Sequence, residues 1–251
     1  MSCSVVVVLP AFNEFERLGG ALSELFAYLD ASAELRDRTT VLVVDDGSDD
    51  GTADLVRAHP AASNHDGRLT VMVVPHAGKG AAVRAGMLAA TGDVIVFSDA
   101  DMATPPDQLP ALLDALEHVD VALGSRIQPD GSDMRASQPF LRRALGRAFH
   151  MLAAAWVTGP VLDTQCGFKG FRREAARDLF ERQRTTGIVF DIELIYLARR
   201  LGYAIAVVPI RWSDKRGSRM RARPGLALHV AWDLFRIPLL HRGVRRAERT
   251  V

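Results

Sequence analysis

Cysteine is scarce in this chain of 251 residues, which contains only Cys3 and Cys166. Two cysteines so far apart form neither a disulfide framework nor the closely spaced set of a zinc site, so we expect a reducing, cytosolic environment. No run reaches the roughly 18 to 20 consecutive apolar residues of a spanning helix, and the apolar run at 4–10 is too short for a signal peptide. We therefore expect any membrane contact to be peripheral.

Two common nucleotide-binding signatures are also absent. No G-x-G-x-x-G follows the first apolar run, which disfavours a dinucleotide-binding fold, and no G-x-x-x-x-G-K-[ST] occurs, which argues against a P-loop NTPase. Aromatic residues are not interleaved with basic ones outside the C-terminal segment, so we expect no nucleic-acid partner.

The net charge of +1 conceals an uneven distribution. Residues 211–251 hold 11 Lys and Arg against 3 Asp and Glu, whereas residues 1–210 hold 20 against 27. A basic segment of this kind is typical of chains that meet an anionic surface, although a solvated basic tail has the same composition. Within it, residues 226–240 have the pattern of an amphipathic helix that carries Trp232 and Phe235. Such a helix either lies at a membrane interface or packs on the domain.

Apolar runs alternate with helical periodicity along the rest of the chain. The pattern predicts buried strands at 4–9, 40–44, 69–74, 94–97, 119–123, 168–171 and 204–210, with Pro10 ending the first. It predicts helices at 18–29, 79–90, 139–157 and 191–201, and a mobile loop at 127–138. We interpret this as a single α/β domain over residues 1–212, in which helices cover both faces of a mostly parallel sheet. Residues 213–251 then form a separate basic segment.

Two carboxylates follow the expected strand at 94–97. Asp99 and Asp101 are two residues apart, and in extended chain such side chains point to the same side. They are expected at the carboxyl end of the strand, where open α/β sheets bind ligands. Carboxylate oxygens suit Mg²⁺ or Mn²⁺, and such ions often complete their shell with substrate phosphates. A solvated acidic turn is the alternative.

Polar side chains follow two further strands. Asn13 and Glu14 come after the first, and Asp45 and Asp46 end the second. If the strands are parallel, these residues share one edge of the sheet with Asp99. Asp45 and Asp46 are suited to accept hydrogen bonds from a base N–H or a ribose hydroxyl.

Glycines flank a lysine before the helix expected at 79–90. In Gly78-Lys79-Gly80 the glycines permit close approach of a ligand to the backbone, and a helix N-terminus favours anions. Lys79 is placed to meet a phosphate there, unless the segment is an ordinary surface turn.

Taken together, these motifs resemble the family 2 glycosyltransferases of the GT-A fold. The likeness rests on the order and spacing of residues 9–14, 44–52, 78–80 and 99–101. Residues 124–126, 163–169 and 190–194 are similar to those of dolichyl- and polyprenyl-phosphate sugar synthases. The greatest likeness is to the dolichyl-phosphate β-glucosyltransferase branch.

The resemblance implies an inverting, metal-dependent transfer of a hexose from a nucleotide sugar to a polyprenyl or dolichyl monophosphate. The expected donor is UDP-glucose, and the expected sugar is glucose. It places the nucleotide against several residues, namely Pro10, Asn13, Glu14, Asp46, Lys79, Asp99, Ala100 and Asp101, with Asp45 beside them. Asp99 and Asp101 would hold Mg²⁺ or Mn²⁺.

The same resemblance suggests the acceptor side of the site. Arg126, with Arg142 or Arg143, would hold the acceptor phosphate, because a guanidinium matches phosphate oxygens bidentately. Asp163 would position the acceptor or the sugar, or act as a base, unless it only fixes the turn before Cys166. The enzyme would work at the cytoplasmic face of a membrane as a peripheral protein.

Other functions remain open from the sequence. One is a mannosyl synthase that uses GDP-mannose, and another is a soluble glycosyltransferase with a non-lipid acceptor. A nucleotidyltransferase also joins an α/β sheet to paired carboxylates, but its expected Gly-rich loop after the first strand is missing. A non-catalytic nucleotide-binding module would tolerate loss of Asp99 and Asp101.

Overall fold

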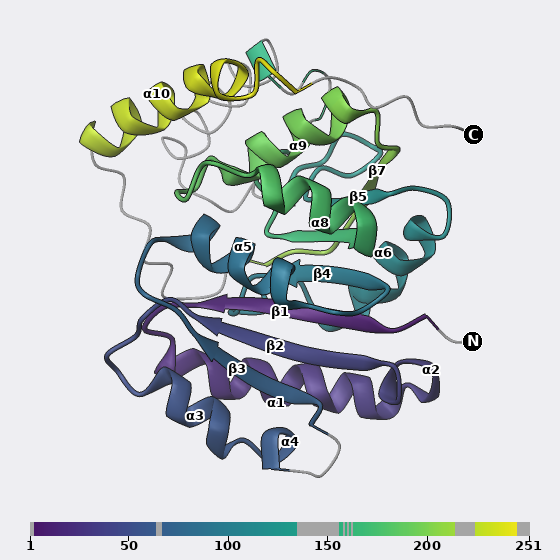
Figure 1. Cartoon of the computed structure of the whole chain (residues 1–251). Coiled ribbons are helices and arrows are strands. Elements are labelled where there is room, and N and C mark those ends of the chain that lie inside the picture. The colour runs from purple at the N-terminus through teal and green to yellow at the C-terminus, as the bar shows by residue number, and fades with distance from the viewer. Residues whose placement is uncertain are drawn as a thin grey trace.

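The computed structural model describes residues 3–63, 67–134, 163–213 and 224–244, together with 156, 157, 159 and 161. Its strands form one sheet in the order β3-β2-β1-β4-β6-β5-β7 (Figure 1). The strands are β1 (Val5–Ala11), β2 (Thr39–Asp45), β3 (Leu69–Val73), β4 (Val94–Ser98), β5 (Val121–Ser125), β6 (Phe168–Arg172) and β7 (Ile205–Pro209). Strand β6 is antiparallel to both of its neighbours, and the other pairings are parallel. The α/β class and the mostly parallel sheet are confirmed.

Helices cover both faces of this sheet. They are α1 (Phe15–Ala31), α2 (Ala33–Arg36), α3 (Thr52–Ala58), α4 (Pro60–Ser63), α5 (Lys79–Ala89), η1 (Pro106–Gln108), α6 (Leu109–Leu116), α8 (Arg173–Arg182), α9 (Phe190–Leu201) and α10 (Pro224–Leu240). Helices α1, α3 and α6 bury apolar side chains against one face, and α5, α8 and α9 against the other.

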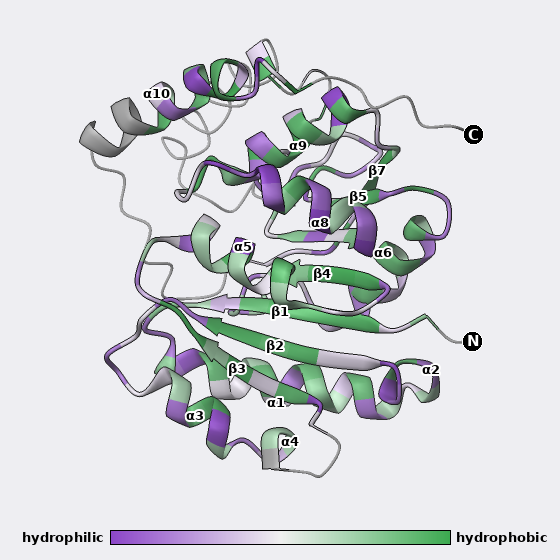
Figure 2. Cartoon of the chain, in the orientation of Figure 1, coloured by the Kyte–Doolittle hydropathy of each residue, from purple (hydrophilic) through white to green (hydrophobic). Residues whose placement is uncertain are grey.

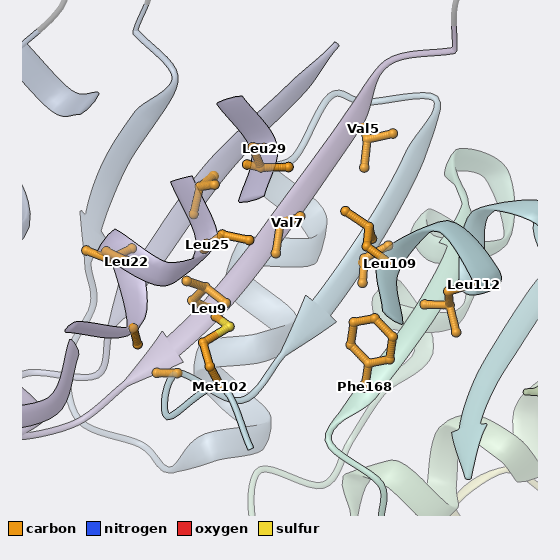
Figure 3. Close-up of a cluster of buried hydrophobic side chains, with 14 of the residues drawn as sticks. Val5, Val7, Leu9, Leu22, Leu25, Leu29, Met102, Leu109, Leu112 and Phe168 are labelled. Atoms are coloured by element: carbon orange, nitrogen blue, oxygen red, sulfur yellow. The ribbon is translucent and has the colours of Figure 1, made fainter. Parts of the chain in front are cut away.

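The central strand β1 divides the core between the two faces, because successive side chains of a strand point to opposite sides. Val5, Val7 and Leu9 pack with α1 and α6, as Figure 3 shows for the labelled side chains. Val6 and Val8 belong to the cluster beneath α5. Burial on both faces explains why β1 is an unbroken apolar run, which Figure 2 displays as continuous green along most of the strand.

Three features differ from the sequence-based expectations. Strand β1 runs through Pro10 to Ala11, because its pairing with β4 ends at Val8 and the missing proline N–H breaks no ladder there. The direction of β6 was not anticipated, and α8 was not expected. The predicted helix at 139–157 and residues Arg142 and Arg143 lie outside the described residues, apart from 156 and 157.

The expected loop at 127–138 is described up to residue 134. This part folds back on itself, with a bridge between Ile127 and Asp133 and a hydrogen bond from Met134 N to Arg126 O. Helix α10 packs against α9 through Val230, Leu234 and Ile237. No helix among the described residues is long and apolar enough to cross a membrane.

Helix α5 lies in close contact with β1 and β2, and Gly86 makes this contact possible. A Cβ at Gly86 would lie 2.5 Å from Val8 Cγ1 and 2.6 Å from Val44 Cγ2. Replacing this glycine therefore forces buried side chains to move.

We expect Gly86→Ala to lower the free energy of unfolding by roughly 1–3 kcal/mol, since overpacking outweighs the gain in helix propensity. Gly20→Ala is the matched control, because this helical glycine of α1 is exposed and a Cβ added there would meet no atom within 4 Å. It should raise the free energy by about 0.5–1 kcal/mol. Urea denaturation measures both values, and equal stabilisation by the two substitutions would refute the packing argument.

Candidate active site

A cavity of about 290 Å³ opens at the carboxyl ends of β1, β2 and β4. Its lining contains seven of the residues predicted from the sequence, which are Pro10, Glu14, Asp46, Lys79, Asp99, Ala100 and Asp101. Phe12, His76 and Gly78 also line it. The parallel order β2-β1-β4 brings the three loops to one edge, as the sequence predicted.

Asp99 is held tightly on two sides. Its Oδ1 accepts a hydrogen bond from Lys79 Nζ at 2.5 Å, and its backbone N donates to Gly167 O at 3.0 Å. A Cβ at Gly167 would lie 2.1 Å from Asp99 Oδ2, so only glycine leaves room for this carboxylate. Gly167 belongs to the motif at 163–169 but was not predicted as a site residue.

Asp101 lies in the same cavity, in the turn that follows β4. Its Oδ1 accepts from Ala103 N at 3.1 Å. Burial, together with the negative charge of Asp99, raises the pKa of Asp101. Two carboxylates that destabilise each other's charge are a setting that a divalent cation relieves.

Lys79 begins α5 and faces this acidic group. Burial alone would lower its pKa, but the carboxylates of Asp99, Asp191 and Asp101 outweigh burial and raise it. Lys79 is therefore a protonated ammonium at neutral pH, beside both carboxylates proposed as metal ligands.

Asp46 is buried and organises the loop before α5. Its two carboxylate oxygens accept hydrogen bonds from Ala77 N at 2.9 Å and Gly78 N at 3.0 Å. His76 Nδ1 lies 2.9 Å from Oδ2 of the same carboxylate. Asp46 thereby fixes the turn that presents Lys79, in addition to lining the cavity.

An aromatic wall stands beside Asp46. The rings of Phe12 and His76 stack with centroids 4.2 Å apart and an interplanar angle of 21°. Phe12 is 41% exposed, so it offers a flat apolar surface to a ligand in the cavity. The sequence analysis missed this wall, although both residues lie inside or next to the quoted motifs.

Asn13 and Asp45 do not line the cavity. Asn13 adopts a positive φ of 54° and accepts from Asp49 N at 3.0 Å, while Asp45 Oδ1 accepts from Ser48 N at 3.0 Å. Ser48 Oγ in turn accepts from Asn13 N. These contacts tie the loops after β1 and β2 together, so the two predicted nucleotide ligands build the rim of the site.

Arg126 and Asp163 are brought together, but outside the lining of this cavity. Arg126 Nε and Nη2 each donate to the carboxylate of Asp163 at 2.7 Å, and Arg126 N donates at 2.9 Å. The guanidinium also lies over the ring of Trp212, 5.6 Å from its centroid. Burial alone would lower the pKa of Arg126, but Asp163 and, more weakly, Asp99 raise it.

A second buried ion pair supports the segment that carries Gly167. Lys169 is completely buried, and its Nζ donates to Asp191 Oδ1 at 2.6 Å and to the Cys166 carbonyl. Cys166 is buried, which raises the pKa of its thiol to about 12, so it behaves as a small apolar residue of the core. The pair ties Cys166 and Lys169 to the first turn of α9.

The loop at 183–187 packs over the start of α5. Gly80 N donates to Thr186 O at 2.8 Å, and Gln183 Nε2 donates to Gly80 O at 2.9 Å. Glu193 anchors this loop by accepting from Arg184 N and Thr185 N, and His241 Nε2 lies 2.6 Å from Glu193 Oε1. Burial alone would raise the pKa of Glu193, but these hydrogen bonds lower it.

The residues at the cavity fit part of a divalent cation's shell. No group of three or more His, Cys, Asp and Glu side chains suited to a metal occurs among the described residues. Asp99 and Asp101 would supply two oxygen ligands, and phosphate oxygens of a bound ligand would supply others, as is usual for Mg²⁺. Because Gly167 has no Cβ, the Asp99 carboxylate can occupy this position, from which it would bind the cation.

Comparison with known proteins points to one family. Residues 6–180 match the model of glycosyl transferase family 2. A dolichyl-phosphate β-glucosyltransferase of Trichomonas vaginalis is 37% identical over 94% of this chain and 71% of its own length. The enzymes of that name from Drosophila melanogaster and Saccharomyces cerevisiae are 35% and 31% identical over 87% and 85% of this chain, and are covered over 70% and 68% of their lengths.

Solved structures share the fold. Glucosyl-3-phosphoglycerate synthase from Mycobacterium tuberculosis, in complex with UDP, has a TM-score of 0.66 at 24% identity, covering 94% of this chain and 80% of the other. A complex of that enzyme with Mn²⁺, UDP and phosphoglyceric acid has a TM-score of 0.65 at 23% identity, with coverage of 98% and 80%. Mannosyl-3-phosphoglycerate synthase from Rubrobacter xylanophilus has a TM-score of 0.68 at 18% identity, with coverage of 99% and 77%.

The tight contact at Gly167 leads to a prediction. Gly167→Ala should displace the Asp99 carboxylate and weaken binding of Mn²⁺ in the presence of UDP by about 10- to 100-fold, the range seen when the support of a metal ligand is lost. Electron paramagnetic resonance of free Mn²⁺ measures this. Gly187→Ala, where a Cβ meets no atom within 4 Å, is the control and should bind normally. Normal binding by Gly167→Ala would contradict the assigned role of Asp99.

Proposed function

Since this chain belongs to glycosyl transferase family 2, we propose that it transfers glucose from UDP-glucose to a polyprenyl or dolichyl monophosphate, with inversion at the sugar carbon. The observation that carries the proposal is the meeting of Asp99, Asp101 and Lys79 in one cavity at the carboxyl edge of the sheet. The identity of 31–37% to dolichyl-phosphate β-glucosyltransferases supports the choice of sugar and acceptor.

The donor would occupy this cavity with its base against the aromatic wall. Phe12 offers a stacking surface, and the lining carboxylate of Asp46 is held beside it by His76 and Gly78. The diphosphate then reaches the start of α5, where Lys79 and the helix N-terminus favour negative charge. Neighbouring structures with bound UDP and Mn²⁺ support this placement.

Departure of UDP leaves negative charge on its terminal phosphate. A divalent ion held by Asp99 and Asp101 supplies Lewis-acid stabilisation of that charge. Lys79 adds a second positive charge on the same side of the cavity. Gly167 and the Lys169–Asp191 pair keep Asp99 in position while the bond breaks.

The acceptor needs little activation. A phosphate monoester is already anionic near pH 7, because its second pKa is about 6, so its oxygen attacks without a strong base. Asp163 is therefore not needed as a base. Its carboxylate accepts two hydrogen bonds from the guanidinium of Arg126, so its role is to orient that guanidinium. We assign Arg126 to attraction of the acceptor phosphate at the carboxyl end of β5.

Helix α10 would bring the enzyme to the lipid. While Val230, Leu234 and Ile237 pack inward, Trp232, Phe235 and Leu239 are 58%, 49% and 59% exposed. Trp156 stacks on Phe235 with ring centroids 5.5 Å apart and is itself half exposed. Exposed aromatic residues within the basic segment at 211–251 suit an anionic membrane surface, so we propose peripheral attachment at the cytoplasmic face.

A radiolabelled transfer assay tests the reaction. The protein, Mg²⁺ or Mn²⁺ and a short polyprenyl phosphate are offered UDP-glucose or GDP-mannose, and label should enter the lipid fraction with UDP-glucose. Asp101→Ala should lower the rate by about 10²-fold or more, because it removes charge stabilisation of the leaving group. Asp107→Ala is the control, since Asp107 lies in η1, pairs with Arg211 and does not line the cavity.

Three results would change the assignment. Label from GDP-mannose alone would make the chain a mannosyl synthase. Donor consumption without a lipid product would point to a soluble acceptor, and full activity of Asp101→Ala would remove the metal from the mechanism.

Membrane attachment is tested with vesicles that contain anionic lipid. The double substitution of Trp232 and Phe235 by Ser should weaken cosedimentation by roughly tenfold or more, because it removes apolar surface from the interface without touching the buried face of α10. Val207→Ser, at a position 47% exposed on β7, is the control and should bind as the unmodified protein does. Unchanged cosedimentation of the α10 variant would refute this contact.

A further inference from the structure

Lys79 and Asp99 form an ion pair at the place where the metal is expected. The two atoms involved, Lys79 Nζ and Asp99 Oδ1, lie 2.5 Å apart. Both residues line the cavity, and their side chains are 36% and 39% exposed, so solvent ions reach the pair. The positive charge that neutralises Asp99 here belongs to the protein itself.

Lys79 holds Oδ1, one of the two oxygens that Asp99 offers to a metal. The carboxylate also lies against Gly167, since Oδ2 and Oδ1 are 2.1 Å and 2.5 Å from the position that a Cβ would take there. A divalent cation bound at about 2.0–2.1 Å from Oδ1 would lie against the ammonium group, and the two positive charges would repel strongly.

The lysine has an alternative place to go. Its flexible four-carbon stem starts at the first residue of α5, where the helix dipole favours an anion. A donor diphosphate at this point would accept the ammonium when Asp99 turns to a metal. The exchange replaces the Lys79–Asp99 pair with two contacts, one between Asp99 and the metal and one between Lys79 and the diphosphate. It requires the metal and the diphosphate to be present together.

We propose that Lys79 is an exchangeable counter-ion of Asp99. It occupies the carboxylate in the empty enzyme and transfers to the diphosphate when metal and nucleotide bind, so that each ligand strengthens the binding of the other. This inference rests on the proposed function, because it takes Asp99 as a metal ligand and a nucleoside diphosphate as the ligand of Lys79. Reciprocal coupling between the two affinities is its thermodynamic consequence.

The test measures binding, independently of transfer. Mn²⁺ affinity is followed by electron paramagnetic resonance with and without UDP, and UDP affinity by calorimetry with and without Mn²⁺. The unmodified protein should bind Mn²⁺ weakly alone and about tenfold or more tightly with UDP, within the usual range of coupling. Lys79→Met should bind Mn²⁺ alone about tenfold more tightly, bind UDP more weakly and lose most of the coupling.

Two further variants separate exchange from simple loss of charge. Lys79→Arg keeps a cation at this position and should retain weak binding of Mn²⁺ alone. Arg17→Met removes a cation that lies near Asp101 but pairs with Glu14, and it should change Mn²⁺ affinity far less than Lys79→Met does. An equal gain in Arg17→Met would overturn the exchange, as would unchanged or weaker binding of Mn²⁺ alone by Lys79→Met.

The outcomes also distinguish this inference from the proposed function. Binding of Mn²⁺ alone needs no donor, so the result for Lys79→Met stands whichever nucleotide sugar is used. If no label enters the lipid but Mn²⁺ and UDP still strengthen each other's binding, the proposed lipid acceptor is wrong and the exchange of Lys79 still holds. If Lys79→Met does not fold, as judged by its melting temperature, Lys79→Gln replaces it in the same measurements.

Discussion

The antiparallel insertion of β6 between β4 and β5 is the constraint on which the site depends. Because Ser98 pairs with Phe168, the residue before β6 meets the residue after β4, and Gly167 comes to lie against Asp99. The same insertion joins the β3-β2-β1-β4 half of the sheet to β5 and β7. A parallel strand at this place would bring its other end to the carboxyl edge, and the motif at 163–169 would then lie far from Asp99.

Two buried ion pairs lie at this junction, and their main effect is to fix the positions of loops. Removing two charges from water costs about as much as their attraction returns, so Lys169–Asp191 and Arg126–Asp163 add little net stability. Each pair instead fixes a loop at the carboxyl edge. Lys169 ties the Cys166 carbonyl to α9, and Asp163 binds the main-chain N–H of Arg126 as well as its side chain. An apolar replacement would fill the space without fixing these loops.

The sequence predicted the strands and the edge of the sheet at which the cavity lies, because buried parallel strands are apolar runs and Asp46 and Asp99 follow two of them. It did not predict the direction of β6, since the side-chain period of two is the same in both directions. Nor did it distinguish Asp46, which lines the cavity, from Asp45, which closes a turn on Ser48. Adjacent strand residues face opposite sides, and only the register decides which one faces the cavity.

The proposed membrane helix and the donor end of the cavity are joined by a continuous set of contacts. His241, in the turn after α10, reaches Glu193 of α9, and Glu193 holds the main chain of the loop at 183–187. That loop binds Gly80 at the start of α5, where Lys79 meets Asp99. His241 and Glu193 are buried and have few alternative partners, so the contacts between α10, α9 and this loop are stiff. The surface proposed to meet a lipid and the start of α5, which carries Lys79, are thus held in one fixed relation, as the proposed transfer between a nucleotide sugar and a lipid requires.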